Sequence, residues 1–279
     1  MLKYLDYTFF TNALCGVVLI SICSALVGTY IISRRMVAIS GGVTHACFGG
    51  LGLGYFLGIN PVVMAGVFAV GSSACVEFMS RRMHLREDSA IAVVWALGMA
   101  LGVLFVFLTP GYVPELNAFL FGNILTVTSS DLLAFVVFTA VLAAFFAWQY
   151  RNIVAVAFDR DFATVAGLPV KFVSYTMTVF VAICIVLTIR LAGVMMLMSV
   201  LSLPIITAEV FWSRFKPVLY ASVVFSLLAS VGGLFLSTVV DVPCSALIVL
   251  FMVAIFAVSK TVALIKNNLQ RNKIKKINK

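Results

Sequence analysis

Long apolar runs that are almost free of charge recur along the whole chain. A helix needs about 17–25 such residues to cross the hydrocarbon core of a bilayer. Runs of this kind cover approximately residues 10–32, 36–58, 61–79, 89–108, 132–150, 172–189, 191–210, 218–240 and 243–264. Because they are continuous and do not alternate between apolar and polar residues, they indicate helices and not the strands of a closed barrel. The sequence therefore predicts an all-α, polytopic transmembrane bundle of about nine helices.

The composition excludes a water-soluble fold. Hydrophobic residues make up 63% of the chain and charged residues 10%, whereas soluble domains average about 45–50% apolar and about 25% charged residues. So few polar residues could not provide the surface needed to cover so large an apolar core in water. We expect residues 1–264 to form a single transmembrane domain and residues 265–279 to form a basic cytoplasmic tail. The break between the sixth and seventh runs, near Arg190, is either a turn or a kink.

The basic residues fall almost entirely on one side of the predicted membrane. If the spans alternate in direction, seventeen of the nineteen Lys and Arg residues lie on one side, and Lys3 and Arg190 lie on the other. Basic residues are retained on the cytoplasmic side, so the N-terminus is expected outside and the C-terminus inside. The net charge of +9 follows from this topology. It favours contact of the tail with anionic membrane lipid over binding of nucleic acid.

The chain lacks the motifs that would make it an enzyme by itself. It contains no GxxxxGK[ST] loop to bind ATP phosphates and no HExxH motif to hold a catalytic metal. Its six cysteines are scattered without CxxC spacing, so they indicate apolar packing and not a disulfide framework or a zinc site. Met195 and Met196 are interpreted as packing residues in the same way.

Ionisable residues inside predicted spans are the first candidates for function. They are costly in lipid and face the protein interior or a water-filled path. There are four of them: His45, Glu77, Glu209 and Asp241. Glu77 and Glu209 lie near cytoplasmic ends, each a few residues before an arginine, so ion pairing or snorkelling explains them better than metal ligation. Asp241 lies at an outer end, where it either caps the next helix or faces a pathway.

His45 lies well inside the second span, in the glycine-rich stretch 40–50 (SGGVTHACFGG). A neutral imidazole can ligate a borderline transition metal without carrying charge into lipid. The alternative is a histidine that is hydrogen-bonded across a helix interface. The surrounding glycines either allow close approach of helices or line a path that bulk would obstruct. Cys47 lies about 200° further round the helix, so the two side chains cannot readily face one ion.

Two loops differ in composition from the spans. Residues 109–131 (TPGYVPELNAFLFGNILTVTSSD) lie outside, and their apolar middle is too short to cross, which is typical of a re-entrant or interfacial helix. Residues 157–169 (AFDRDFATVAGLP) lie in the cytoplasm and predict a short helix, with Asp159 or Asp161 near its start and Gly167 as its C-cap. Such a helix has nothing to bury unless a partner receives it. A surface helix without a partner is the alternative.

Six segments, in this order along the chain, resemble the integral permease of the ABC-type zinc, manganese and iron uptake family, the ABC-3 family. They are RRMVAISGGVTHACFGGLGLGYFLG from residue 34, EDSAIAVVWALGMALGVLF from 87, LNAFLFGNILTVTSSDL from 116, AFDRDFATVAGLPV from 157, LAGVMMLMSVLSLPIITAEVF from 191 and GLFLSTVVDVPCSALIV from 233. The resemblance therefore extends from about residue 34 to the last span.

This resemblance implies ATP-driven import of divalent metal ions (zinc, manganese or iron) across the cytoplasmic (inner) membrane of a bacterium. It implies a homodimer of this chain, two copies of a separate ATP-binding subunit, and an extracytoplasmic metal-binding protein that delivers the ion. The chain itself would hold no cofactor, and ATP would be bound by the partner subunit. A cytoplasmic helix near residues 158–168 would couple to the ATPase through Phe158, Asp159, Asp161, Ala163, Ala166 and Gly167.

The resemblance also implies a transient metal pathway with His45 and Asp241 as candidate metal residues. In many family members an aspartate stands four residues before the histidine, on the same helical face, whereas this chain has Gly41 there. One hard ligand is missing, and the identity of the transported ion stays open. A permease for metal chelates and an ATP-independent secondary metal transporter are the alternative functions.

Overall fold

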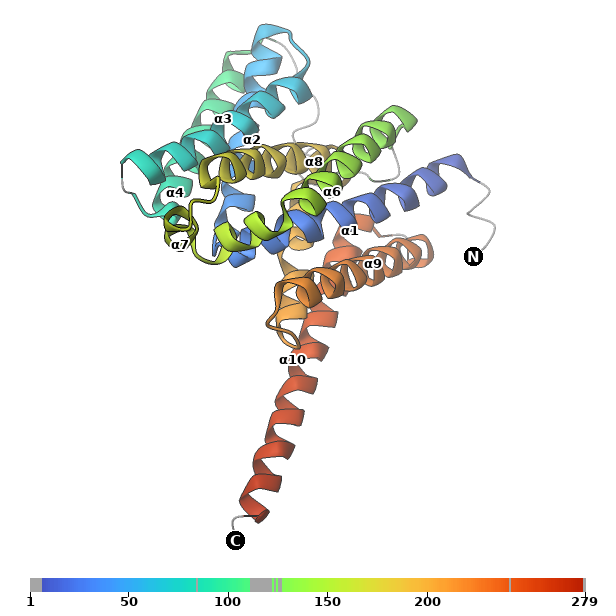
Figure 1. Ribbon diagram of the computed structural model, residues 1–279. Helices are drawn as coiled ribbons and strands as arrows, with labels where there is room; N and C mark the ends of the chain where they lie inside the picture. The colour runs from blue at the N-terminus through green and yellow to red at the C-terminus, as the bar shows by residue number, and fades with distance from the viewer. Residues whose placement is uncertain are drawn as a thin grey trace.

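The computed structural model describes residues 7–83, 85–110, 122, 124, 127–240 and 242–277 (Figure 1). Within these residues the long elements are helices: α1 (Thr8–Ser33), α2 (Val37–Leu57), α3 (Pro61–Arg82), α4 (Glu87–Leu108), α6 (Ser129–Phe158), α7 (Arg160–Val165), α8 (Val170–Glu209), α9 (Phe215–Val240) and α10 (Cys244–Ile277). All of them except α7 are long and apolar enough to cross a membrane. The predicted all-α transmembrane bundle is therefore confirmed. The re-entrant or interfacial helix expected within residues 109–131 falls mostly outside the described residues.

Local capping chemistry explains where several helices begin and end. The Asn60 side chain accepts hydrogen bonds from the first turn of α3, and Pro61 stands at the first helical position, where its missing N–H costs nothing. A reciprocal capping box between Thr128 and Asp131 starts α6. α2 ends at Gly58, which adopts a left-handed conformation with φ 66°. These signals are read directly from short stretches of sequence.

α1 and α6 lie side by side and run in the same direction. Near their starts, the Asn12 side-chain amide donates to the Val127 carbonyl at 3.3 Å. Halfway along, the Cys23 thiol and the Thr139 hydroxyl are hydrogen-bonded at 3.0 Å. The first contact joins the starts of the two helices and the second joins their middles, so α1 and α6 are parallel and define a direction to which the other helices can be compared.

α8 contains both spans that were predicted at residues 172–189 and 191–210. The helix is broken at Gly193, which has φ 79° and ψ 170°, a conformation that is essentially restricted to glycine. Gly122 lies against this break, and a Cβ on Gly122 would overlap main-chain atoms of Ala192 and Gly193. The expected interruption near Arg190 is therefore a break within one helix, three residues further along.

The two halves of α8 run in opposite directions. Before the break, Arg190 forms an ion pair of 2.8 Å with Asp131 at the start of α6. After the break, Ile205 packs with Ile32 at the end of α1. Because α1 and α6 run in parallel, α8 reaches one end of the bundle and returns to the other. The reversal at Gly193 thus accounts for two of the predicted crossings.

Glycines bring α2 into close contact with α3 and α4. A Cβ on Gly50 of α2 would overlap the main chain of Met64 in α3, and a Cβ on Gly98 of α4 would overlap Ala46 of α2. Helices in a membrane associate through packing, and small residues let their backbones approach. Close approach of helices, one of the two roles predicted for the glycines around His45, is therefore confirmed.

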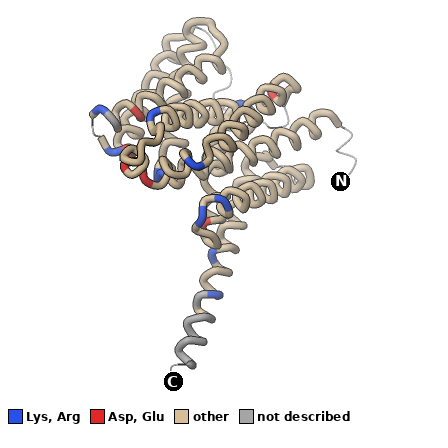
Figure 2. Tube along the Cα trace, viewed as in Figure 1, with Lys and Arg blue, Asp and Glu red and all other residues tan. Residues whose placement is uncertain are grey.

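Charged residues gather at one end of the described bundle, which we call the charged end and which consists of the turns at residues 34–36, 83–86, 158–169 and 210–214. Figure 2 shows Lys and Arg at the α3–α4 turn, around α7, at the α8–α9 turn and along α10. α10 extends away from the rest of the molecule (Figure 1). The basic segment 265–279 begins within this helix, since α10 continues to Ile277.

Gly50→Ala is expected to destabilise the bundle, and Gly71→Ala is the matched control in α3. The added methyl group on Gly50 would meet the main chain of Met64, which cannot move without separating α2 from α3, whereas nothing lies within 4 Å of a Cβ on Gly71. Overpacking typically costs about 1–3 kcal/mol. We expect a lower Tm in detergent for Gly50→Ala and an unchanged or slightly higher Tm for Gly71→Ala. Equal melting temperatures would contradict this packing role.

Candidate functional site

His45 lies on α2 and faces α4. Its ring is stacked on Trp95 of α4, with 4.6 Å between ring centroids and 4° between ring planes. The stack fixes the plane of the imidazole and leaves the two nitrogens free at the ring edge. Among the described residues no hydrogen bond to the ring of His45 is found, so the alternative of an interhelical hydrogen bond receives no support. The imidazole is therefore held in place by packing against Trp95.

The position one turn before His45, Gly41, faces the same region. A Cβ on Gly41 would lie 2.6 Å from Cε and 3.9 Å from Sδ of Met198, and 3.9 Å from the Trp95 ring. Met198 belongs to the returning half of α8. The end of the Met198 side chain thus occupies the space where a Cβ at position 41 would lie, and the Trp95 ring lies in van der Waals range of that space. An imidazole and a soft thioether approach the same region, where α2, α4 and α8 meet.

The other residues proposed from the sequence lie elsewhere. Asp241, the second candidate metal residue, lies outside the described residues. Glu209 is exposed at the end of α8. In the described part of the chain no group of three or more His, Cys, Asp and Glu side chains is placed to hold a metal ion. Met198 was missed by sequence reasoning, because nothing in a single sequence indicates that it packs against Gly41.

α7 is the short helix that the sequence predicted. Asp159 is its N-cap and accepts a hydrogen bond from the Phe162 N–H at 2.8 Å, which settles the choice between Asp159 and Asp161. After the helix, Gly167 adopts φ 73°, and the Leu168 N–H donates to the Ala163 carbonyl at 3.0 Å, as in a Schellman motif. The helix boundaries are therefore determined by local hydrogen bonds.

α7 has one buried face and one exposed apolar face. Ala163 is fully buried against the bundle. Three large apolar side chains are exposed there: Phe158, the last residue of α6, is 61% exposed, and Phe162 and Val165 of α7 are 65% and 89% exposed. Of the residues predicted to couple to a partner, Asp159, Asp161, Ala166 and Gly167 are exposed with Phe158, whereas Ala163 supports the helix from beneath. Phe162 and Val165 were missed, although their spacing places them on the outer face.

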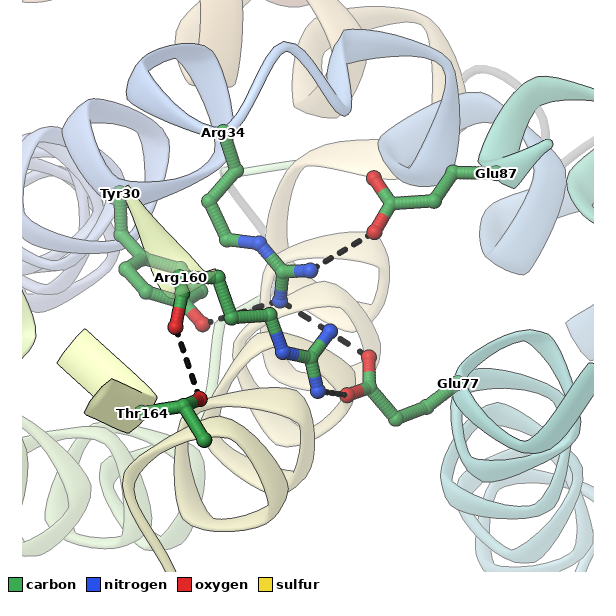
Figure 3. Close-up of polar contacts among 6 residues, drawn as sticks. All are labelled: Tyr30, Arg34, Glu77, Glu87, Arg160 and Thr164. Atoms are coloured by element: carbon green, nitrogen blue, oxygen red, sulfur yellow. Dashed lines mark hydrogen bonds and ion pairs between the residues drawn. The ribbon is translucent and has the colours of Figure 1, made fainter. Parts of the chain in front are cut away.

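A buried ionic cluster joins α7 to three other segments (Figure 3). Arg160 at the start of α7 pairs with Glu77 of α3, with 3.0 Å between Nη2 and Oε1. Arg34, in the turn between α1 and α2, lies with Nη1 3.8 Å from Oε2 of Glu77 and with Nη2 2.7 Å from Oε1 of Glu87, the first residue of α4. The prediction that Glu77 forms an ion pair is confirmed, but the partners that the structure describes are Arg160 and Arg34 from distant segments and not the neighbouring arginine that its position suggested.

The centre of the cluster is withdrawn from solvent, whereas Arg160 and Glu87 at its edge are partly exposed. The side chains of Glu77 and Arg34 are only 2% and 6% exposed. Burial alone would lower the pKa of the Arg34 guanidinium. The opposing effects are larger and come from the Tyr30 hydroxyl, which accepts a hydrogen bond from Arg34 at 3.2 Å, and from the carboxylates of Glu87 and Glu77. The pKa of Arg34 therefore lies above its usual value. Arg34 is therefore a permanent positive charge at the centre of the cluster.

Comparison with known proteins places these features in a family. The chain matches the model of the ABC 3 transport family over residues 6–263. A probable metal transport system membrane protein of Chlamydia pneumoniae is 32% identical over 83% of this chain and 81% of its own length. The manganese transport system membrane protein MntC of Listeria monocytogenes is 25% identical over 91% of each chain. The solved structure of PsaBC from Streptococcus pneumoniae in complex with Fab contains a chain that superimposes with a TM-score of 0.79 and 26% identity, over 92% of this chain and 94% of that one.

Proposed function

Because the chain belongs to the ABC 3 transport family, we propose that it is the membrane-spanning permease subunit of an ATP-driven importer of divalent transition-metal ions. The observation that carries this proposal is the family match, which spans nearly all the transmembrane helices. Relatives named as metal and manganese transport proteins match over most of their own length. The geometry adds a transmembrane imidazole and an exposed helix that is suited to a partner.

We assign the charged end to the cytoplasm of a bacterium, with the N-terminus outside and the C-terminus inside, in the inner membrane. The gathering of basic residues in the turns around α7 and along α10 supports this orientation. In this orientation α7 faces a separate ATP-binding subunit, and the basic end of α10 lies at anionic lipid. An extracytoplasmic metal-binding protein would deliver the ion to the other end, and two copies of the chain would form the permease.

His45 is proposed to contact the ion during passage. Its ring is oriented by Trp95, and it can stay neutral in an apolar environment. Met198 lies where a carboxylate at position 41 would otherwise reach the ion. Nitrogen and thioether ligands suit zinc and iron(II) better than the hard manganese ion. We therefore infer a preference for the borderline ions, with Asp241 retained as a second candidate ligand.

The exposed face of α7 is proposed to bind the ATPase. Phe158, Phe162 and Val165 would lose their exposed apolar surface in such a contact, which favours association. The rigid capping by Asp159 and the turn at Gly167 hold this face in a fixed orientation. A fixed, protruding apolar helix is suited to transmitting a movement of its partner to the membrane helices.

His45→Ala is expected to lower metal uptake by about tenfold or more, since it removes a ligand. The measurement is uptake of zinc, manganese and iron(II) into proteoliposomes that hold the chain with its ATPase and are supplied by the binding protein, with and without ATP. Cys47→Ala is the matched control, because it truncates a side chain on the same helix away from His45. Uptake without ATP would favour a secondary transporter, and equal uptake by His45→Ala and wild type would exclude the pathway role.

Gly41→Asp is expected to shift selectivity toward manganese, because it adds a hard carboxylate ligand. The Cβ of the new side chain would overlap the end of the flexible Met198 side chain, so we expect the effect to be larger in the double variant Gly41→Asp, Met198→Ala. Competition between manganese and zinc during uptake measures the shift. If the ratio of the two ions is the same in wild type and in both variants, this region does not select the ion.

Val165→Asp is expected to prevent binding of the ATPase without unfolding the permease. Val165 is 89% exposed, so the charge stays in water in the free chain, but binding would bury it. Copurification of the ATPase with the tagged permease measures the contact. Ser213→Asp, an equal charge in the exposed turn between α8 and α9, serves as the control. Normal copurification with Val165→Asp would show that the partner binds elsewhere.

A further inference from the structure

We propose that Glu77 is a positioning residue for transport, which transmits movement of α7 to the two helices that hold the His45–Trp95 stack. The proposal rests on the function given above and goes beyond it, because it assigns the mechanical link to a specific buried carboxylate. That carboxylate receives Arg160 from α7 on one side and Arg34 on the other (Figure 3).

The connections of the cluster lead directly to the ligand region. Arg34 lies three residues before α2, the helix that carries His45, and it is bonded to Glu87, the first residue of α4, the helix that carries Trp95. A displacement of Arg160 therefore acts on the charged ends of both helices through Glu77. No other ion pair that the structure describes joins α7 to the rest of the molecule.

Burial makes this link difficult to break. Removing a charge from water costs several kcal/mol per ion, and this cost is recovered only while the ion stays paired. If α7 moved without Glu77, a carboxylate that is 2% exposed would lose a partner at 3.0 Å. A movement of α7 therefore either carries α3 with it or leaves Glu77 to its remaining partners, among which Arg34 lies at 3.8 Å. Both outcomes convert movement of α7 into rearrangement among the membrane helices.

The distances indicate which exchange of partners is available. Arg34 is bound tightly to Glu87 at 2.7 Å and only loosely to Glu77 at 3.8 Å. When α7 withdraws, Arg34 is already close enough to replace Arg160 at Glu77, and it would then loosen its bond to Glu87. This would release the start of α4 from the turn before α2. A cluster with two alternative pairings is a two-state element of the kind that coupling requires.

The test measures the number of metal ions imported per ATP hydrolysed by the complete transporter in proteoliposomes. Glu77→Gln and Arg160→Gln keep the approximate size of each side chain and remove its charge. We expect each to lower the ratio of ions to ATP by at least about fivefold, within the range of coupling between sites, while the assembled complex continues to hydrolyse ATP. The double variant should be no worse than the single variants, because both remove the same link. Arg151→Gln, which neutralises an exposed arginine on α6, should keep the wild-type ratio.

A purely structural role would reduce assembly and leave the ratio of ions to ATP unchanged in the complexes that do form. An unchanged ratio of ions to ATP in both single variants would overturn the proposal. A double variant whose ratio falls by the product of the two single effects would also overturn it, because the two residues would then act independently. If Glu77→Gln does not assemble, the variants Arg160→Gln and Arg160→Lys test the proposal instead, because Arg160 lies at the edge of the cluster. A wild-type ratio of ions to ATP in both variants overturns the proposal. A ratio that is lowered in Arg160→Gln and partly restored in Arg160→Lys supports it. If the wild-type complex shows no ATP-dependent uptake, the proposed function itself is refuted. This outcome is distinct from failure of the present proposal, which is judged only from the variants.

Discussion

The main constraint on this protein is that main-chain polar groups in lipid must be satisfied within the protein. Continuous helices meet this constraint, but they leave no exposed hydrogen-bonding groups to hold the helices together. Association then depends on packing, and glycines such as Gly50 and Gly98 supply it by letting backbones touch. The same close contacts place α2 beside α4, so that His45 meets Trp95. The site is thus a consequence of how the bundle is packed.

Polar groups are divided between two regions of the molecule according to their cost in lipid. At the charged end, ions are buried only as members of a paired cluster, in which two arginines oppose two glutamates. Further inside, the candidate ligand groups are an imidazole and a thioether, which need no counter-ion. This division suits the transport that we propose, in which the charged region would transmit movement and the inner region would bind the ion only weakly.

Packing at position 41 bears on the ion preference that we propose. Where the resemblance to the family leads us to expect an aspartate, this chain has Gly41, and the end of the Met198 side chain fills the space beside it. Under the proposed function, Met198 would offer a soft sulfur atom to the ion where an aspartate at position 41 would offer a hard oxygen. A relative that is named for manganese transport matches 91% of this chain, and the preference for zinc or iron(II) that we propose would distinguish this chain from it.

The sequence by itself determined the features that depend on short-range chemistry. These include the apolar spans, the one-sided distribution of basic residues and α7 with its turn at Gly167, because hydropathy and capping act within a few residues, whereas the choice of Asp159 over Asp161 as the cap of α7 came from the structure. Only the tertiary structure decided the partners of Glu77, the position of Met198 and the reversal of α8 at Gly193. Arg160 and Glu77 are 83 residues apart in the chain, and Arg34 and Glu87 are 53 apart. Such pairings depend on how the helices pack in three dimensions, and no local pattern in one sequence carries that information.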